Sequence, residues 1–381
     1  MTPIHRTDPS SGPDQGAIVQ QGFGTISRRQ AGLSLVELLV AMVLGLFLIG
    51  GILNLFLSNR ESFRVNENLS RMQENGRAAF DVMSRSVREA GENSCGTALV
   101  ANVIRNASGT IPWWADWNAG TVQGFNGDQD ATSIVAFGTA NGSRVAGTDA
   151  ILVFQAEQTE RVVTNHSAAT NEMTMQSVDG IDADDVVIAC DMNSAAILQV
   201  GTVSASLRIL DYTASMTALN CGNALGYPTP AVCSTAGAKI FDPGTRVARL
   251  SATFWYVGLN SKNQRALFRS RISKVTAAGA TTVTPVREEM LSGVQDLQIN
   301  YLTKNLSTSA LATVWVDAND SVFSVGNNAW TDTNLNQAIA ARFNLTLQSE
   351  ENVSVDGQPI QRRLAHVVAL RSRDALIQST P

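Results

Sequence analysis

The stretch that decides the fold lies near the amino end, where residues 33–57 read LSLVELLVAMVLGLFLIGGILNLFL. Within it, residues 38–53 are sixteen in a row without a polar side chain. As an α-helix, residues 33–57 would be ~37 Å long, enough to cross a bilayer core of ~30 Å. No second stretch of this kind follows. The sequence therefore predicts one transmembrane helix over 33–57.

Charged residues before and inside this stretch indicate its orientation and distinguish it from a plain membrane anchor. Arg28 and Arg29 precede it, and positive charge on that flank predicts that the amino end stays in the cytoplasm. Glu37 lies inside the apolar run, where a carboxylate costs a few kcal/mol, so we expect it to have a functional partner. A cleaved secretory signal is the weaker alternative, because the residues after 57 offer no small-x-small site.

Residues 32–37, GLSLVE, resemble the type III signal of type IV prepilins. In that family a basic leader ends in glycine, a dedicated peptidase cuts after the glycine, and glutamate is the fifth mature residue. The resemblance implies a leader over 1–32 that prepilin peptidase removes after Gly32, and N-methylation of Leu33. It also implies that Glu37 pairs with the α-amine of an adjacent subunit and sets the stagger between subunits. The aromatic first mature residue typical of the family is here Leu33.

The helical pattern continues through 58–91, which we predict to be the amphipathic half of the same helix. Its apolar residues recur at steps of three and four and form one stripe: Val65, Leu69, Met72, Ala79, Phe80, Met83, Val87 and Ala90. The other faces carry oppositely charged pairs four residues apart: Glu67/Arg71, Asp81/Arg85 and Arg85/Glu89. Gly91 is a credible stop. The stripe is expected to pack on a β-sheet.

The remaining residues, 92–381, read as β structure. Strands are predicted at 133–137, 149–155, 185–189, 196–202, 206–210, 246–257, 265–272, 295–302, 311–316, 341–348 and 365–371, and a short helical turn at 287–291. Residues 246–257 and 265–272 flank a turn-rich loop and form a hairpin. Strands without intervening helices favour antiparallel pairing. The predicted class is α+β and pilin-like, with one long amino-terminal helix packed on a large antiparallel β-sheet region.

Segments spread over the mature chain resemble the PilW family of minor pilins. They are 73–78 with 88–91, 147–153, 190–191 with 196–200, 255–258 with 266–269, and 292–301 (SGVQDLQINY). The resemblance implies a minor pilin that waits in the inner membrane, with its β domain periplasmic, before it joins the pilus. Its implied partners are other minor pilins and the major pilin at the pilus tip, with a tip adhesin. The alternative is a type II secretion pseudopilin that contacts exported substrates.

Four cysteines fall on the exported side, where an even number suggests disulfides. Cys221 and Cys233 bracket a turn-rich loop, whereas Cys95 and Cys190 match the pair that the family resemblance implies. Three pairings are open by counting, and we favour Cys95–Cys190 with Cys221–Cys233.

Other candidate sites each have a structural alternative. Trp113, Trp114 and Trp117 form either a subunit-docking patch or, as we favour, a small core under a loop. The acidic groups Asp182, Asp184 and Asp185, or Asp128 and Asp130, lack the full spacing of a calcium loop and read as turn residues.

Catalysis and nucleic-acid binding find no support in the sequence. His5, His166 and His366 lie far apart, and the chain has no Cys-x-x-Cys pair, no nucleophile motif and no phosphate-binding loop. The net charge is −5 and no basic block occurs. We therefore expect an assembly protein without catalytic residues, metal or cofactor, and no nucleic-acid partner.

Overall fold

The computed structural model describes residues 34–91, 100–106, 108–157, 159–213, 219–225, 233, 239–277, 280–324, 329–331, 336–354 and 356–371. Arg28, Arg29, Gly32, Leu33 and Cys95 lie outside the described residues. The chain divides into two compact units, Met1–Arg60 and Glu61–Pro381. We call the second unit the domain.

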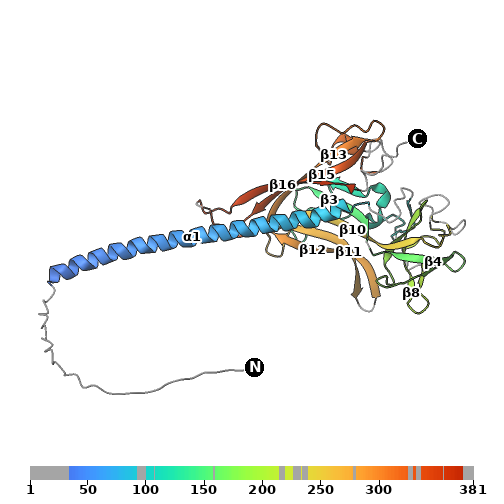
Figure 1. Ribbon diagram of the computed structural model, residues 1–381, viewed down its shortest axis with the longest axis horizontal. Coiled ribbons are helices and arrows are strands. Elements are labelled where there is room, and N and C mark those ends of the chain that lie inside the picture. Colours follow the sequence, from blue (N-terminus) through green and yellow to red (C-terminus); the bar gives the residue numbers. More distant parts are fainter. Residues whose placement is uncertain are drawn as a thin grey trace, which may run out of the picture. The chain divides into compact units, whose positions relative to one another are not determined.

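The helix α1 runs over Leu35–Arg88 (Figure 1). Ser34 begins it: the Val36 N–H donates to Ser34 Oγ at 3.2 Å, and the Leu38 N–H donates to the Ser34 carbonyl at 3.1 Å. At the other end Gly91 adopts φ +75°, a left-handed conformation that ends helices and favours glycine. The prediction of one helix ending before Gly91 is confirmed.

The domain contains a twelve-stranded and a four-stranded sheet. The first comprises β1 (Val100–Asn102), β2 (Val122–Phe125), β3 (Ala150–Ala156), β4 (Arg161–Ser167), β5 (Glu172–Met175), β6 (Val186–Cys190), β7 (Ala195–Gln199), β8 (Thr202–Ser204), β9 (Ile209–Asp211), β10 (Arg246–Leu259), β11 (Arg265–Ala277) and β12 (Ala280–Ser292). The second comprises β13 (Val294–Asn305), β14 (Val316–Asp317), β15 (Asn336–Gln348) and β16 (Gln361–Ala369). Three short 3₁₀ turns are η1 (Trp113–Ala115), η2 (Trp117–Ala119) and η3 (Ser321–Phe323).

Antiparallel pairing dominates both sheets. Among the described strands only β1 and β7 pair in parallel. The long strand β10 pairs with β3, β4, β6 and β11. The predicted β10–β11 hairpin is present, with Leu259 opposite Arg265. These observations confirm an α+β, pilin-like arrangement of one long helix followed by a large, mainly antiparallel sheet region.

The amphipathic half of α1 packs into a core shared by both sheets. Met72, Ala79, Met83 and Val87 are buried against residues of β10, β13 and β15. A Cβ added to Gly76 would meet the Cδ1 atoms of Leu364 and Leu347 at 2.5 and 2.6 Å. Glycine therefore lets the helix approach β15 and β16 this closely without displacing the two leucine side chains.

Two further clusters fill the rest of the domain. Successive residues of β10 point to opposite faces: Trp255 and Val257 join the core under α1, whereas Phe254 and Tyr256 join a second cluster. A third cluster lies around Met173, Leu198 and Phe241. Burial on both faces explains why residues 254–257 of β10 (FWYV) are apolar without interruption instead of alternating with polar residues.

Several local predictions are wrong. Residues 287–291 are not a helical turn but part of β12, because Glu288 pairs across the strands with Arg269 and Arg271 of β11. Residues 133–137 form a turn and an isolated bridge, where the Ile134 and Val135 N–H groups both donate to the Ala131 carbonyl. Most of 206–210 is a turn with Arg208 at φ 57°, and most of 311–316 is irregular.

Candidate functional site

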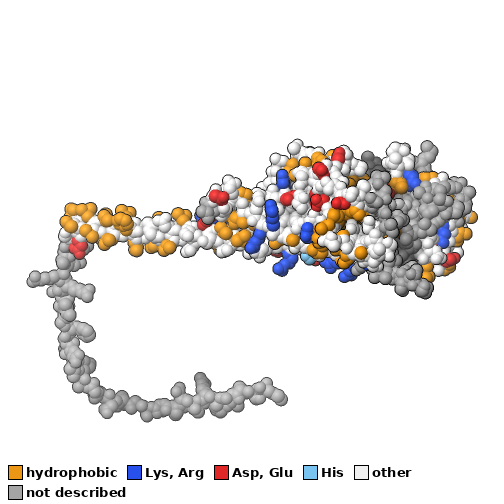
Figure 2. Space-filling model, turned by 90° about the horizontal axis from the view of Figure 1, so that it is seen from above, with side chains coloured by type: hydrophobic (Ala, Val, Ile, Leu, Met, Phe, Trp, Pro, Cys, Tyr) orange, Lys and Arg blue, Asp and Glu red, His pale blue; other side chains and the backbone are white. Residues whose placement is uncertain are grey.

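The first unit exposes its apolar residues. Leu46, Phe47 and Leu55 are 70%, 78% and 68% exposed, and other large side chains along this part of α1 behave similarly. Figure 2 shows apolar side chains along the whole of this segment. α1 is the only described helix long and apolar enough to cross a membrane. So much exposed apolar surface must be covered by lipid or by other helices.

Glu37 lies in the first turn of α1 and its side chain is exposed. The carboxylate makes no hydrogen bond or ion pair with any described residue. A negative charge is favourable at a helix amino end, where the first N–H groups are unsatisfied. Glu37 therefore presents an exposed carboxylate at the amino end of the helix.

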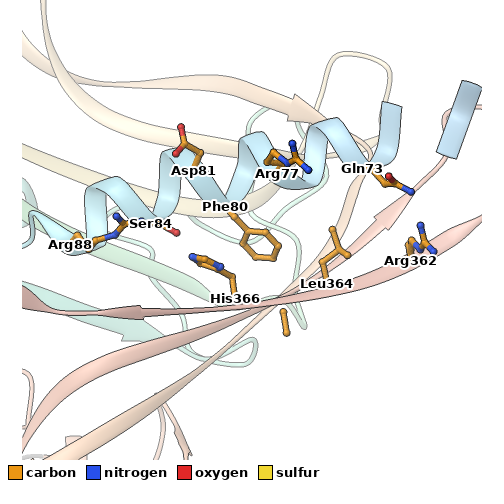
Figure 3. Close-up of a pocket in the computed structure, with 10 residues that line it drawn as sticks. Gln73, Arg77, Phe80, Asp81, Ser84, Arg88, Arg362, Leu364 and His366 are labelled. Atoms are coloured by element: carbon orange, nitrogen blue, oxygen red, sulfur yellow. The ribbon is translucent and has the colours of Figure 1, made fainter. Parts of the chain in front are cut away.

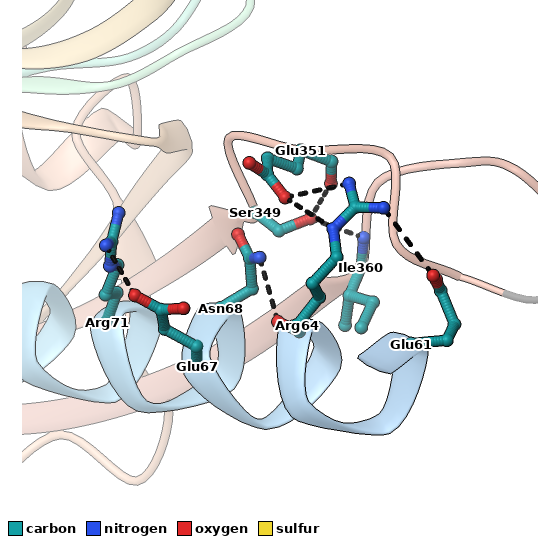
Figure 4. Close-up of polar contacts among 8 residues, drawn as sticks. All are labelled: Glu61, Arg64, Glu67, Asn68, Arg71, Ser349, Glu351 and Ile360. Carbon is teal, nitrogen blue, oxygen red and sulfur yellow. Dashed lines mark hydrogen bonds and ion pairs between the residues drawn. The ribbon is translucent and has the colours of Figure 1, made fainter. Parts of the chain in front are cut away.

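A polar clamp ties the amphipathic half of α1 to the connection between β15 and β16 (Figure 4). The Arg64 guanidinium donates to Glu351 Oε2 at 3.0 and 3.3 Å, and this contact raises the pKa of Arg64 and lowers that of Glu351. Asn68 Nδ2 donates to the Arg64 carbonyl, while Ser349 Oγ donates to the Glu351 carbonyl and accepts from the Ile360 N–H. The clamp is exposed, so it orients the two segments more than it stabilises them.

An open groove of about 520 Å³ lies between α1 and β16, lined by six residues of the helix and four of the strand (Figure 3). We call it the α1–β16 groove. Phe80 of α1 and His366 of β16 meet in it, with ring centroids 5.3 Å apart. Arg77, Arg88 and Arg362 also line it. Sequence reasoning missed this groove, because α1 and β16 are almost 300 residues apart in the chain.

The three described cysteines, Cys190, Cys221 and Cys233, are all disulfide-bonded. Cys221 and Cys233 are bonded, with Cα atoms 5.2 Å apart, as we favoured from the sequence. Cys190 is also disulfide-bonded. Because Cys95 lies outside the described residues, the Cys95–Cys190 pairing stays a prediction.

The tryptophans are structural. Trp114 and Trp117 are 5% and 6% exposed, and Trp113 packs against the same cluster. The docking patch proposed for these three residues is therefore wrong, and the small core is right. The 3₁₀ turns η1 and η2 bury the rings under the sheet, which residue type alone could not reveal.

The acidic groups do not gather around a cation site. Lys274 Nζ contacts Asp185 at 2.9 Å and Asp182 at 3.3 Å, and the Asp182 N–H donates to Asp185 Oδ2. Asp130 accepts from Thr132. Among the described residues, no three metal-binding side chains come together.

His166 is buried and held on both sides. Its Nδ1 accepts from the Phe241 N–H at 2.8 Å, and its Nε2 lies 2.7 Å from the Tyr212 hydroxyl. Burial, with a smaller contribution from Lys239, lowers the pKa of His166 to about 4. The neutral ring links β4 to the segment before β10 and has a structural role.

A second buried polar group joins the loop before β3 to β13. The Arg144 guanidinium donates to the carbonyls of Gln129, Asn126 and Thr148 at 2.9, 2.9 and 2.7 Å. Asp149 accepts from the Ile299 N–H at 2.7 Å, and burial raises the pKa of its carboxyl to about 6. Nothing in the sequence pattern distinguishes these two residues from surface charges.

Residues 27–53 match the prokaryotic N-terminal methylation motif. The matched span includes Arg28, Arg29, Gly32, Leu33 and Glu37. With the exposed apolar helix and the β-rich domain, the motif supports a type IV pilin or a type II secretion pseudopilin. The signal and the apolar helix fit a protein that prepilin peptidase processes, that is anchored in the inner membrane, and that then assembles with other pilins. No curated protein and no solved structure matches the chain significantly.

Proposed function

We propose that the chain is a minor pilin of the PilW type, which assembles with other minor pilins to prime or cap the tip of a type IV pilus. The observation that carries the proposal is the free carboxylate of Glu37 in the first turn of an exposed apolar helix, inside the methylation motif. Such a helix serves as a membrane anchor before assembly and as a packing element in a filament.

The proposed partner of Glu37 is the methylated α-amine of the adjacent subunit. That amine has an ordinary pKa of ~7.7–8.0 and is largely cationic at neutral pH. Where water is excluded, an unpaired charge costs on the order of 3–5 kcal/mol relative to the pair. The pair would therefore favour one stagger of neighbouring helices over others.

The proposed orientation in the membrane rests on the charges that flank the same segment. Arg28 and Arg29 favour an amino end on the cytoplasmic side. The domain, with its disulfides, would then lie in the periplasm and later on the pilus, both of which are oxidising. A catalytic role is not part of the proposal, and the buried His166 is given a structural role through its contacts with Tyr212 and Phe241.

The test compares wild type with Glu37→Ala at equal abundance in the membrane. We expect insertion to be unchanged or improved, because a costly charge is removed from the span. Recovery in sheared pili and in complexes with other minor pilins should fall several-hundred-fold, corresponding to about 3–4 kcal/mol. Glu67→Ala, which removes an exposed carboxylate further along α1, is the matched control and should assemble normally.

Equal recovery of Glu37→Ala and wild type would contradict an assembly role for Glu37. A protein that instead co-purifies with a secretion pseudopilus and its exported substrates would be the alternative, a type II pseudopilin. The methylation motif supports both machines, so isolating the filament that contains the chain separates them.

A further inference from the structure

The α1–β16 groove combines two features that a protein partner can use together. β16 is an edge of the four-stranded sheet: it pairs with β15, and no described residue pairs with its other side. The groove runs beside this edge. An unpaired strand edge presents backbone N–H and C=O groups that accept an added strand.

Positive charge is concentrated along the same groove. Arg77, Arg88 and Arg362 line it, and none of their guanidinium groups makes an ion pair or hydrogen bond with a described residue. Asp81 is the one acidic residue among those that line it. Three other arginines of the amphipathic half of α1 differ, since Arg64, Arg71 and Arg85 each pair with a glutamate, whereas Arg60 makes no ion pair with a described residue.

The groove also contains a buried hydroxyl group without a hydrogen-bond partner among the described residues. Ser84 lines it and is 1% exposed, yet its hydroxyl has no hydrogen-bond partner among the described residues. A buried polar group without a partner is costly, and native proteins seldom leave one. An apolar surface lies beside it, formed by Phe80 and Leu364.

We propose that the groove binds an acidic, extended segment of a partner protein, which adds to β16 as a strand and pairs its carboxylates with the groove arginines. This goes beyond the proposed function, because it holds for any filament that contains the chain.

The spacing of the arginines defines the segment. Arg77 and Arg88 are eleven residues apart on α1, ~16 Å along the helix axis. Alternate residues of a strand face one side and repeat every ~6.6 Å. Acidic residues four positions apart, ~13 Å, would thus reach both guanidinium groups, with an apolar residue between them over Phe80.

Side-chain alternation in β16 supplies a matched control. Arg362, Leu364 and His366 share one face and line the groove, whereas Arg363 belongs to the opposite face. Arg362 and Arg363 are both exposed, so charge reversal at either should leave the fold intact. The two variants carry the same net charge and differ only in the face that they present.

The probe is a labelled seven-residue peptide with glutamates at its second and sixth positions, a valine at the fourth and threonines elsewhere. Binding to the full chain in detergent is measured by fluorescence anisotropy. We expect Arg362→Glu to weaken binding about tenfold or more and Arg363→Glu to change it less than twofold. A peptide with glutamines in place of glutamates, and one with N-methylated backbone amides, should both bind at least tenfold more weakly.

Equal losses for Arg362→Glu and Arg363→Glu would mean unspecific charge attraction and would overturn the proposal. Unchanged binding of the glutamine peptide would exclude the arginines, and unchanged binding of the N-methylated peptide would exclude strand addition. In a further outcome, the peptide fails to bind while the chain associates with itself and Arg362→Glu abolishes this self-association. That result would overturn the proposal and assign the groove to a second copy of the chain.

Discussion

Residues 35–60 expose nearly all of their apolar side chains, whereas the domain buries three apolar clusters of its own. Met42 and Met83 illustrate the difference, since both lie on α1 but are 59% and 0% exposed. A helix without a core of its own depends on lipid or neighbouring helices for its burial. The domain is instead stabilised by contacts within the chain, so the two units should respond differently to the same substitution.

The largest expected effect separates these two methionines. Met83→Ala leaves a cavity under α1 and should lower the free energy of unfolding of the domain by about 2–5 kcal/mol. Met42→Ala removes the same atoms from the exposed segment and should change the free energy of unfolding of the domain by less than about 0.5 kcal/mol. Urea denaturation of the full chain in detergent, followed by tryptophan fluorescence, measures both. Similar losses for the two variants would mean that residues 35–60 have a core within this chain.

Removing the Cys221–Cys233 bond should have the next largest effect. The bond closes a short loop, and its loss should cost about 3 kcal/mol, mainly by giving the unfolded chain more freedom. The double variant Cys221→Ser/Cys233→Ser tests this without leaving a free thiol. Thiol titration of unreduced, denatured wild type should find none, and four titratable thiols would contradict the predicted pairing.

Acid should destabilise the domain through His166. Its pKa is lowered to about 4 in the folded state from ~6.5 unfolded, because burial disfavours the charged ring. Its contribution is therefore fully present above pH ~6.5 and is lost as the pH falls towards 4, by at most about 3 kcal/mol. Asp149 acts in the opposite sense: its pKa is raised to about 6, so its contribution is lost as the pH rises through that value.

His166→Gln should reduce the loss of stability that wild type shows as the pH falls from about 6.5 towards 4. Thermal unfolding between pH 4 and 8 provides the measurement. If His166→Gln lost as much stability as wild type between pH ~6.5 and 4, protonation of His166 would not be the cause of the acid destabilisation.

The smallest effect is expected at the exposed clamp. Glu351→Gln removes the charge that pairs with Arg64, and because the pair is exposed to solvent the domain should lose almost no stability. Hydrogen exchange of the connection between β15 and β16 should rise locally while global stability stays nearly unchanged. A large loss of global stability would show that the clamp, and not the buried stripe, holds residues 61–88 of α1 against the sheets.

Local sequence patterns predicted the elements in which the pattern extends over many residues. The stripe of α1 repeats over several turns, and the β10–β11 hairpin has apolar residues on both sides of a turn-rich loop. Glu37 was found because its charge contrasts with its apolar surroundings. Gly76 lies in line with the stripe, and an isolated glycine there is a signal for close packing that sequence reasoning did not use.

The features that escaped prediction depend on contacts between distant segments. Residues 287–291 favour helix locally, but pairing of Glu288 with two arginines of β11 places them in a strand. The short strands β4 and β5 were missed, because their alternation is weak and their pairing with β9 and β10 decides them. The α1–β16 groove requires the fold itself, since no local pattern relates Arg77 to Arg362.

Mass spectrometry of the mature amino terminus tests the central claim most directly. The chain purified from its host should begin at Leu33 with an N-methyl group, as the motif and Gly32 predict. Gly32→Val should retain the leader and abolish incorporation into filaments, whereas Gly24→Val, elsewhere in the leader, should be processed normally. A mature chain that begins at Met1 or at any residue other than Leu33 would contradict the assignment to the pilin class and return the segment to a plain anchor.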